Sequence, residues 1–154
     1  MVLEQTLFLI KPRGMEHESV VLERLESIGA IITYQAYDFA PMDRVQSHYE
    51  RLRQTSPEVY SWFIEGYCGK SMSSGVLQGE DIIERMLLIT GDTDPEQAGA
   101  DTIRHIAYVL NGESLAKSIQ EKRMCDNFIH RSKRDDFKFE RGIWHPDAPL
   151  CGQL

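Results

Sequence analysis

The sequence predicts an α+β fold in which one antiparallel sheet is covered by helices. Short apolar or β-branched runs alternate with stretches of helical periodicity, in the order strand, helix, strand, helices, strand, helix, strand, helix. The chain has 154 residues, 42% of them hydrophobic and 27% charged, which is typical of one globular domain spanning 1–154. A split β-α-β arrangement is the simplest fold of this class.

The first elements follow from apolar pattern and from helix-breaking residues. Residues 4–10 form a short apolar run that Pro12 and Gly14 terminate, which predicts a buried strand. Residues 17–28 carry apolar side chains on one helical face and end at a glycine, so they predict a helix. The run 30–40 is rich in β-branched and aromatic residues and predicts a second strand.

Two helices are expected next. Residues 43–53 have apolar side chains at helical spacing. A further helix is predicted over 57–67, with Ser56 as its cap and a proline at its first position. We expect this helix to bury Trp62 and Phe63.

The second half of the chain contains weaker signals. Residues 90–101 are loop by composition, Ser132 with Asp135 is a candidate cap for the last helix, and the tail 145–154 is expected to be irregular. The remaining expected elements are a weak strand at 70–78, a short helix near 80–88, helices at 102–110 and 113–123, a strand at 125–130 and a last helix to about 141.

Charge and composition exclude several classes of protein. The net charge is −7, with 24 acidic against 17 basic residues, which disfavours nucleic acid as a partner; a small anion would need a local basic cluster. No apolar run approaches the roughly 20 residues of a membrane span, and no secretory leader precedes the first strand. Three widely spaced cysteines give no disulfide framework or zinc pattern, so we expect a cytoplasmic protein.

Three positions are candidates for binding an anion. Lys11 follows a predicted buried strand, although a solvated strand end is the commoner role of such a lysine. The loop 91–95 (GDTDP) is an Asx-rich turn by composition, but it also offers the Thr93 hydroxyl and backbone donors to phosphate. Arg104 stands at the start of a predicted helix, where it either binds phosphate or is simply exposed.

The segment 127–132 (NFIHRS) carries the histidine that we consider as a nucleophile. On a strand, Asn127 and Ile129 would face one way, while Phe128 and His130 would face the other. A histidine there is either a core residue or a nucleophile that is largely neutral near pH 7. The other histidines have no partner signature and are expected to be surface or packing residues: His17, His48, His105 and His145.

Three pieces of the chain also occur in a specific order. They read IKPRG at residues 10–14, GDTDP at 91–95 followed by TIR at 102–104, and NFIHRS at 127–132 followed by Glu140 and GIW at 142–144. Together they resemble the nucleoside diphosphate kinases, whose patterns read IKPDG, GxTxP followed by TIRG, and NxxHxSDS followed by a glutamate and a tryptophan. His48 and Tyr49 also match that family's HY pair. The resemblance covers about residues 4–144. No P-loop, nucleophile elbow, HExxH or dinucleotide fingerprint competes with it.

The resemblance implies a ferredoxin-like β-α-β-β-α-β core and a phosphotransferase. Such an enzyme moves the γ-phosphate of a nucleoside triphosphate to a nucleoside diphosphate by a ping-pong mechanism through a phosphohistidine. Mg²⁺ accompanies the nucleotide phosphates, no metal is bound by the protein itself, and the members are homo-oligomers.

The resemblance also implies roles for individual residues. His130 would be the nucleophile, and Glu140 would orient its far ring nitrogen. Lys11 would act in catalysis and in holding the nucleotide. The other residues expected to hold the phosphates and the sugar are Tyr49, Thr93, Arg104 and Asn127.

The chain departs from the family pattern near the expected site. Arg13 replaces the family's aspartate after KP, and Asp126 replaces a residue that is often basic. Leu87 stands where the family has a second phosphate-binding arginine. Arg85, two residues earlier, is therefore our candidate for nucleotide binding.

The sequence after the expected nucleophile differs as well. Arg131 replaces the family's glycine, and Lys133-Arg134 replaces part of its serine-acid-serine run, with Ser132 retained. These basic residues add positive potential. The chain is also longer before the histidine than in most members, and we expect the stretch near 111–124 to be helical and to lie beside the site or at a subunit interface.

Two alternatives to a working kinase follow from these departures. The first is a catalytically impaired nucleotide-binding or regulatory protein on the same fold, which fails to turn over a second nucleotide. The second is an unrelated two-layer domain with chance motif matches, which binds no nucleotide at all.

Overall fold

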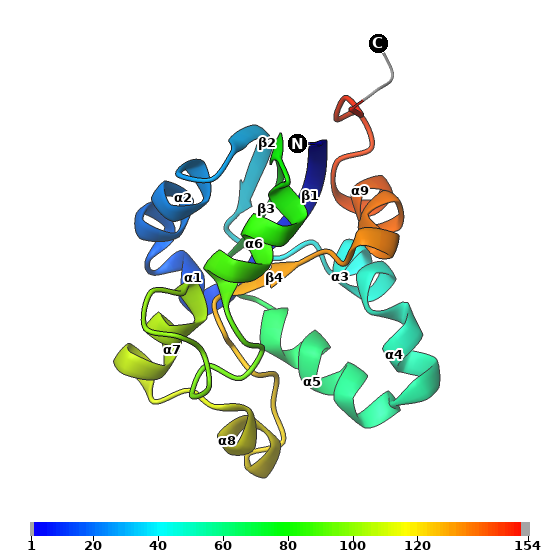
Figure 1. Ribbon diagram of the computed structural model, residues 1–154. Coiled ribbons are helices and arrows are strands. Elements are labelled where there is room, and N and C mark those ends of the chain that lie inside the picture. The colour runs from blue at the N-terminus through cyan, green and yellow to red at the C-terminus, as the bar shows by residue number, and fades with distance from the viewer. Residues whose placement is uncertain (1, 152–154) are drawn as a thin grey trace.

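The computed structural model describes residues 2–151, and its centre is a four-stranded antiparallel sheet (Figure 1). The strand order is β2-β3-β1-β4, so β4 and β2 are the edge strands. The strands are β1 (Leu3–Ile10), β2 (Ala30–Tyr37), β3 (Met72–Glu80) and β4 (Ile129–Arg131). The predicted α+β class is therefore confirmed.

Helices cover both faces of this sheet (Figure 1). They are α1 (Pro12–Met15), α2 (Glu18–Glu26), α3 (Met42–His48), α4 (Glu50–Thr55), α5 (Pro57–Tyr67), α6 (Ile82–Thr90), α7 (Ile103–Asn111), α8 (Leu115–Gln120) and α9 (Phe137–Trp144), with a 3-10 turn at Arg134–Asp136. Among residues 2–151, every helix is too short or too polar to cross a lipid bilayer.

Alternation along β1 divides the apolar core in two. Leu7 and Leu9 pack in one cluster with residues of α3, α5 and α9, whereas Phe8 and Ile10 pack in a second cluster with residues of α2, α6 and α7. Successive strand residues point to opposite faces, so the buried half of β1 contributes side chains to both clusters. All four of these side chains have 0% exposure, which explains why residues 7–10 are all apolar.

The pairing of β1 with β4 positions the candidate site. Leu9 lies opposite His130, and Phe8 lies opposite Arg131. Paired residues share a face, so His130 projects towards α3, α5 and α9, while Arg131 projects towards α6 and α7. Lys11 directly follows β1 and lies two residues after Leu9, so its side chain points to the same face as Leu9. Its Nζ lies over the Phe63 ring of α5, on the His130 face.

The predicted strand 125–130 is wrong in its start and in its alternation. Strand β4 begins only at Ile129, because Phe128 has a φ of 75°, which is outside the β region. Phe128 and Ile129 consequently pack in the same apolar cluster instead of facing opposite ways. The Phe128 carbonyl accepts the Lys11 N–H at 2.8 Å, which ties the start of β4 to the end of β1.

Other local expectations also change. Residues 43–53 form two helices, which meet at Tyr49. A helical turn, α1, was not expected. Trp62 and Phe63 are only partly buried. The 113–123 helix is shorter, since α8 spans Leu115–Gln120.

The expected cap of the last helix is not formed. Helix α9 begins at Phe137, after the 3-10 turn, and no side chain caps it. The Ser132 hydroxyl instead donates to Glu140 inside the molecule. Residues 145–151 contain no helix or strand, and the rest of the predicted irregular tail, 152–154, lies outside the described residues.

Candidate active site

His130 is held by a carboxylate from the last helix. Its Nε2 lies 2.7 Å from Glu140 Oε1, and the Ser132 hydroxyl donates to the same oxygen at 2.8 Å. Glu140 is one helical turn into α9 and is buried. A carboxylate only accepts hydrogen bonds, so Nε2 carries the ring proton and Nδ1 keeps its lone pair. The arrangement therefore fixes both the tautomer and the orientation of the imidazole.

A second histidine lies against this pair, which the sequence analysis did not foresee. The rings of His48 and His130 are 4.7 Å apart and nearly perpendicular, and His48 Nε2 lies 3.9 Å from Glu140 Oε1. The Trp144 indole N–H donates to His48 Nδ1 at 3.1 Å. His48 is thus neither a surface residue nor simple packing, and the HY pair with Tyr49 was the only signal for it.

The environment of His130 keeps its imidazole neutral. Burial lowers the pKa of His130 to about 3, and the positive charges of Lys11, Arg104 and Arg131 act in the same direction. Burial likewise lowers the pKa of His48 to about 3. Burial raises the pKa of Glu140, which the Ser132 hydrogen bond partly offsets. A neutral ring with a free Nδ1 lone pair is a competent nucleophile at neutral pH.

Lys11 is buried beside this nucleophile with no carboxylate partner among residues 2–151. Its Nζ donates to the Cys125 carbonyl at 3.0 Å and lies 5.4 Å from the centre of the Phe63 ring. Burial is the main cause that lowers the pKa of Lys11 to about 8, while Asp126 opposes the shift. The expectation of a solvated strand end is therefore wrong.

Arg104 is buried as well, and its guanidinium braces two segments. Nε and Nη2 donate to the Ile129 carbonyl at 3.3 and 3.0 Å, and Nη1 donates to the Gly91 carbonyl at 3.0 Å. The N-terminus of α7 positions this side chain, because Thr102 caps the helix by accepting from the His105 N–H. The brace joins the 91–95 loop to strand β4.

Asn127 and Thr93 lie together at the edge of the site. The Asn127 Nδ2 donates to the Thr93 carbonyl at 2.9 Å. Asn127 Oδ1 is buried and has no hydrogen-bond partner among the described residues. An orphaned buried acceptor is costly, so a donor such as a sugar hydroxyl would satisfy it.

Tyr49 belongs to an aromatic group under the site. Its hydroxyl lies 3.2 Å from that of Tyr67, and its ring stacks on Phe63 with the centroids 4.4 Å apart. Burial raises the pKa of Tyr49, so the phenol stays protonated. A phenol hydroxyl both donates and accepts, so Tyr49 keeps one hydrogen-bonding capacity beyond its contact with Tyr67.

The structure does not bring Arg85 together with the other candidates. Arg85 is exposed on α6. The hollow around the 91–95 loop is lined instead by Arg131, together with Leu87, Leu88, Gly91, Asp92 and Thr93. Leu87 is 49% exposed at its rim.

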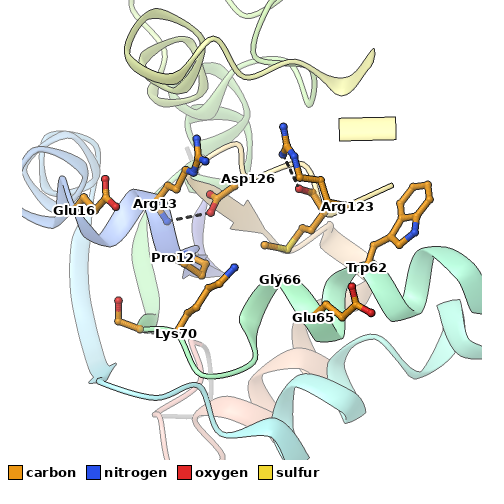
Figure 2. Close-up of a pocket in the computed structure, with 11 residues that line it drawn as sticks. Pro12, Arg13, Glu16, Trp62, Glu65, Gly66, Lys70, Arg123 and Asp126 are labelled. Atoms are coloured by element: carbon orange, nitrogen blue, oxygen red, sulfur yellow. Dashed lines mark hydrogen bonds between the residues drawn. The ribbon is translucent and has the colours of Figure 1, made fainter. Parts of the chain in front are cut away.

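Asp126 serves the backbone rather than a ligand. Its carboxylate accepts the Arg13 N–H at 3.0 Å (Figure 2). It also accepts the Phe128 N–H at 3.3 Å. These bonds hold α1 and the left-handed Phe128 in place. The carboxylate forms one wall of a hollow of about 630 Å³ between α1, α5 and residues 123–126, with Trp62 across from it (Figure 2).

Hydrogen bonds hold the stretch 111–126 near its start and near its end. Arg123 forms two hydrogen bonds with the buried Glu113, at 2.6 and 2.9 Å, and Glu113 also accepts the Asp126 N–H at 2.9 Å. The Leu115 N–H donates to Asp94 Oδ1 at 3.0 Å, so α8 is docked on the 91–95 loop.

One group of side chains could hold a metal ion. Within residues 2–151, the side chains that bring three potential metal-ligating atoms within 4.8 Å of one another are His48, His130 and Glu140. Two of these atoms are nitrogens, whereas Mg²⁺ prefers oxygen. This group is therefore a poor match for Mg²⁺.

Comparison with known proteins identifies the family of this chain. The family model described as "Nucleoside diphosphate kinase" matches residues 4–149. A nucleoside diphosphate kinase of Clostridium perfringens is 31% identical over 158 residues, covering 99% of this chain and 100% of that protein. One from Streptococcus uberis is 27% identical over 145 residues, covering 92% and 94%.

A solved structure shows the same fold. It is the transition state mimic of nucleoside-diphosphate kinase from Borrelia burgdorferi with bound vanadate and ADP. Its TM-score is 0.84 at 24% identity, covering 100% of this chain and 94% of that one. Because the family model matches nearly the whole chain, the chain belongs to the nucleoside diphosphate kinase family.

Proposed function

We propose that this kinase carries the transferred phosphoryl group on Nδ1 of His130. The observation that carries the proposal is the Glu140–His130 hydrogen bond of 2.7 Å, which leaves Nδ1 as the free, neutral ring nitrogen. The substrates are a nucleoside triphosphate and a nucleoside diphosphate, which react in turn.

In the first half-reaction, the Nδ1 lone pair attacks the γ-phosphorus. The bond from that phosphorus to the bridging oxygen breaks, and the nucleoside diphosphate leaves with the electron pair. The ring gains positive charge while Nε2 keeps its proton, and the Glu140 carboxylate stabilises that charge from the far side. In the second half-reaction, a terminal oxygen of another nucleoside diphosphate attacks the phosphorus, and the electron pair of the N–P bond returns to Nδ1.

The surrounding residues bind and align the phosphates. Phosphoryl transfer depends mainly on alignment and on neutralising the charge of the transferred group. Lys11 supplies a buried positive charge on the His130 face, and Arg104 supplies another on the opposite face of β4. We expect Thr93, Asn127 and Tyr49 to bind the phosphates and the sugar.

We propose further that Mg²⁺ comes with the substrate. Nucleotide phosphates supply the oxygen ligands that this cation prefers, and bound Mg²⁺ would neutralise part of their charge. The family resemblance supports a homo-oligomer in the cytoplasm.

The impaired relative is not favoured. That alternative rested partly on Asp126, whose negative charge lay beside the expected site. Its carboxylate instead accepts backbone hydrogen bonds from Arg13 and Phe128. The alternative also rested on Leu87 and on the altered residues after His130.

A phosphoenzyme assay tests the proposal. The full chain is incubated with Mg²⁺ and ATP labelled at the γ-phosphate, and the labelled enzyme is then chased with unlabelled GDP. We expect an acid-labile label on the protein that moves to GDP, and no label on His130→Ala.

The matched control is His145→Ala. His145 is a buried histidine that bonds Ser74 and Thr33, away from the site. This variant should still be labelled if it folds, as circular dichroism would show. Labelling of His130→Ala, or failure of the label to reach GDP, would refute the proposal.

A further inference from the structure

The cations around His130 differ in how many of their donors are already used. Arg104 donates three N–H groups to backbone carbonyls, two to that of Ile129 and one to that of Gly91. Arg131 makes one hydrogen bond within residues 2–151, from Nε to the Thr90 hydroxyl at 3.0 Å. Its Nη1 and Nη2 groups are therefore free for a ligand.

Arg131 also lacks a counter-ion. In the described part of the chain, no carboxylate lies within 4.0 Å of its guanidinium. Asp92 is the acidic residue among those that line the same hollow, and its carboxylate accepts the Asp94 N–H at 2.8 Å. A partly buried guanidinium with a free fork and no carboxylate is arranged for an anion with several oxygens, such as phosphate.

The position of Arg131 joins this hollow to the nucleophile. It directly follows His130 on β4, and its Nε donates to Thr90, the last residue of α6. Thr93 and Gly91 line the same hollow as Arg131, which has a volume of about 410 Å³. The positive charge of Arg131 contributes to lowering the pKa of both His130 and Arg104.

The other basic residues near the motifs are placed elsewhere. Arg134 pairs with Glu4 at 3.0 Å and is 65% exposed. Arg13 lines the separate hollow beside Asp126. Arg85 is exposed on α6 and does not line the hollow of Arg131.

We infer that Arg131 is a phosphate-binding residue of this kinase. Its guanidinium supplies the positive charge that Leu87, in the same hollow, lacks. The inference rests on the proposed function and assigns to that site a residue that its motifs do not include. The ligand is the phosphate chain of the nucleotide, which the free Nη1 and Nη2 groups would bind in this hollow.

The test compares kcat/KM for MgATP with GDP in four variants. Arg131→Gln keeps a side-chain amide that can still bond Thr90 but removes the charge, and it should lose about 10²-fold. Arg131→Lys keeps the charge without the fork and should lose less. Leu87→Arg added to Arg131→Gln should recover at least about tenfold, because residue 87 lines the same hollow. Arg134→Gln is the charge-matched control and should stay close to the wild type.

Thr90→Val separates binding from bracing. It removes the hydroxyl that Arg131 contacts but leaves the guanidinium, and thermal unfolding reports any loss of stability. If Arg131 only braces α6, Thr90→Val loses at least as much activity as Arg131→Gln, and Leu87→Arg restores none. Either result would overturn the inference while leaving the kinase reaction intact.

Binding of MgADP provides a second readout that does not depend on turnover. By calorimetry, Arg131→Gln should weaken MgADP at least about tenfold and leave adenosine unchanged. An inactive wild type would refute the proposed function, and this measurement would still decide the role of Arg131. Equal MgADP affinity in wild type and Arg131→Gln overturns the inference in either case.

Discussion

The two faces of strand β4 hold their functional side chains in different ways. On one face, His130, Glu140 and Ser132 bond one another at 2.7 and 2.8 Å, and Trp144 fixes His48 against them. On the other face, Arg131 bonds one neutral hydroxyl and leaves most of its donors free. The difference follows from the two tasks, since a nucleophile needs a fixed orientation, whereas a phosphate-binding group needs donors in reserve.

The strongest way to break this comparison is Glu140→Gln. The amide can still accept the Nε2–H bond, but it removes the charge that stabilises the phosphorylated ring. We expect the rate of enzyme phosphorylation by ATP to fall by about 10²-fold or more in single-turnover experiments.

Ser132→Ala is the matched control on the same face. It removes one hydrogen bond to Glu140 and leaves the carboxylate in place, so the expected loss is about tenfold or less. Equal losses in the two variants would show that orientation alone, and not the charge of Glu140, assists His130.

Gly14→Ala tests the junction that supports both faces. A Cβ at residue 14 would lie 2.4 Å from the Phe128 carbonyl oxygen, the same atom that accepts the Lys11 N–H. We expect the free energy of unfolding to drop by about 1–3 kcal/mol, measured by urea denaturation.

Gly142→Ala is the control for this change. A Cβ there would meet nothing within 4 Å, and the residue lies inside α9, where alanine favours the helix. The control should be neutral or slightly more stable than the wild type. A Gly14→Ala protein as stable as its parent would mean that Phe128 moves freely, contrary to its role as a fixed support.

The smallest expected effect is a pH dependence from Lys11. Its pKa of about 8 means that the ammonium is charged below that pH and loses its charge above it. His130, with a pKa of about 3, stays neutral throughout. We therefore expect kcat/KM to fall by about tenfold per pH unit well above pH 8, and Lys11→Arg to move that decline upward. If the pH profile of kcat/KM is the same in Lys11→Arg as in the wild type, the decline above pH 8 belongs to another group.

The sequence predicted the elements that carry a clear period or a clear stop. Residues 4–10 and 57–67 read correctly, because apolar content and a first-turn proline are local signals. The break at Tyr49 and the positive φ of Phe128 were not predicted. Both depend on contacts with distant segments, such as the hydrogen bond from the Lys11 N–H to the Phe128 carbonyl.

The candidate site divides in the same way. The motifs pointed to Lys11, Arg104, His130 and Glu140, and the structure places their side chains around one end of β4. His48 was missed, because a residue 82 positions before His130 gives no local sign of touching it. Similarly, no spacing rule showed that Arg131 reaches the hollow beside Leu87.

The hydrogen bonds of the buried Lys11 ammonium have a consequence for the cost of ligand binding. Its partner is the Cys125 carbonyl, a neutral acceptor, and not an acid. An arriving phosphate therefore separates no ion pair and leaves no carboxylate stranded; it exchanges one acceptor for a better one. The chain carries an overall charge of −7, yet within residues 2–151 no carboxylate pairs with this ammonium, so it stays available to an anionic substrate.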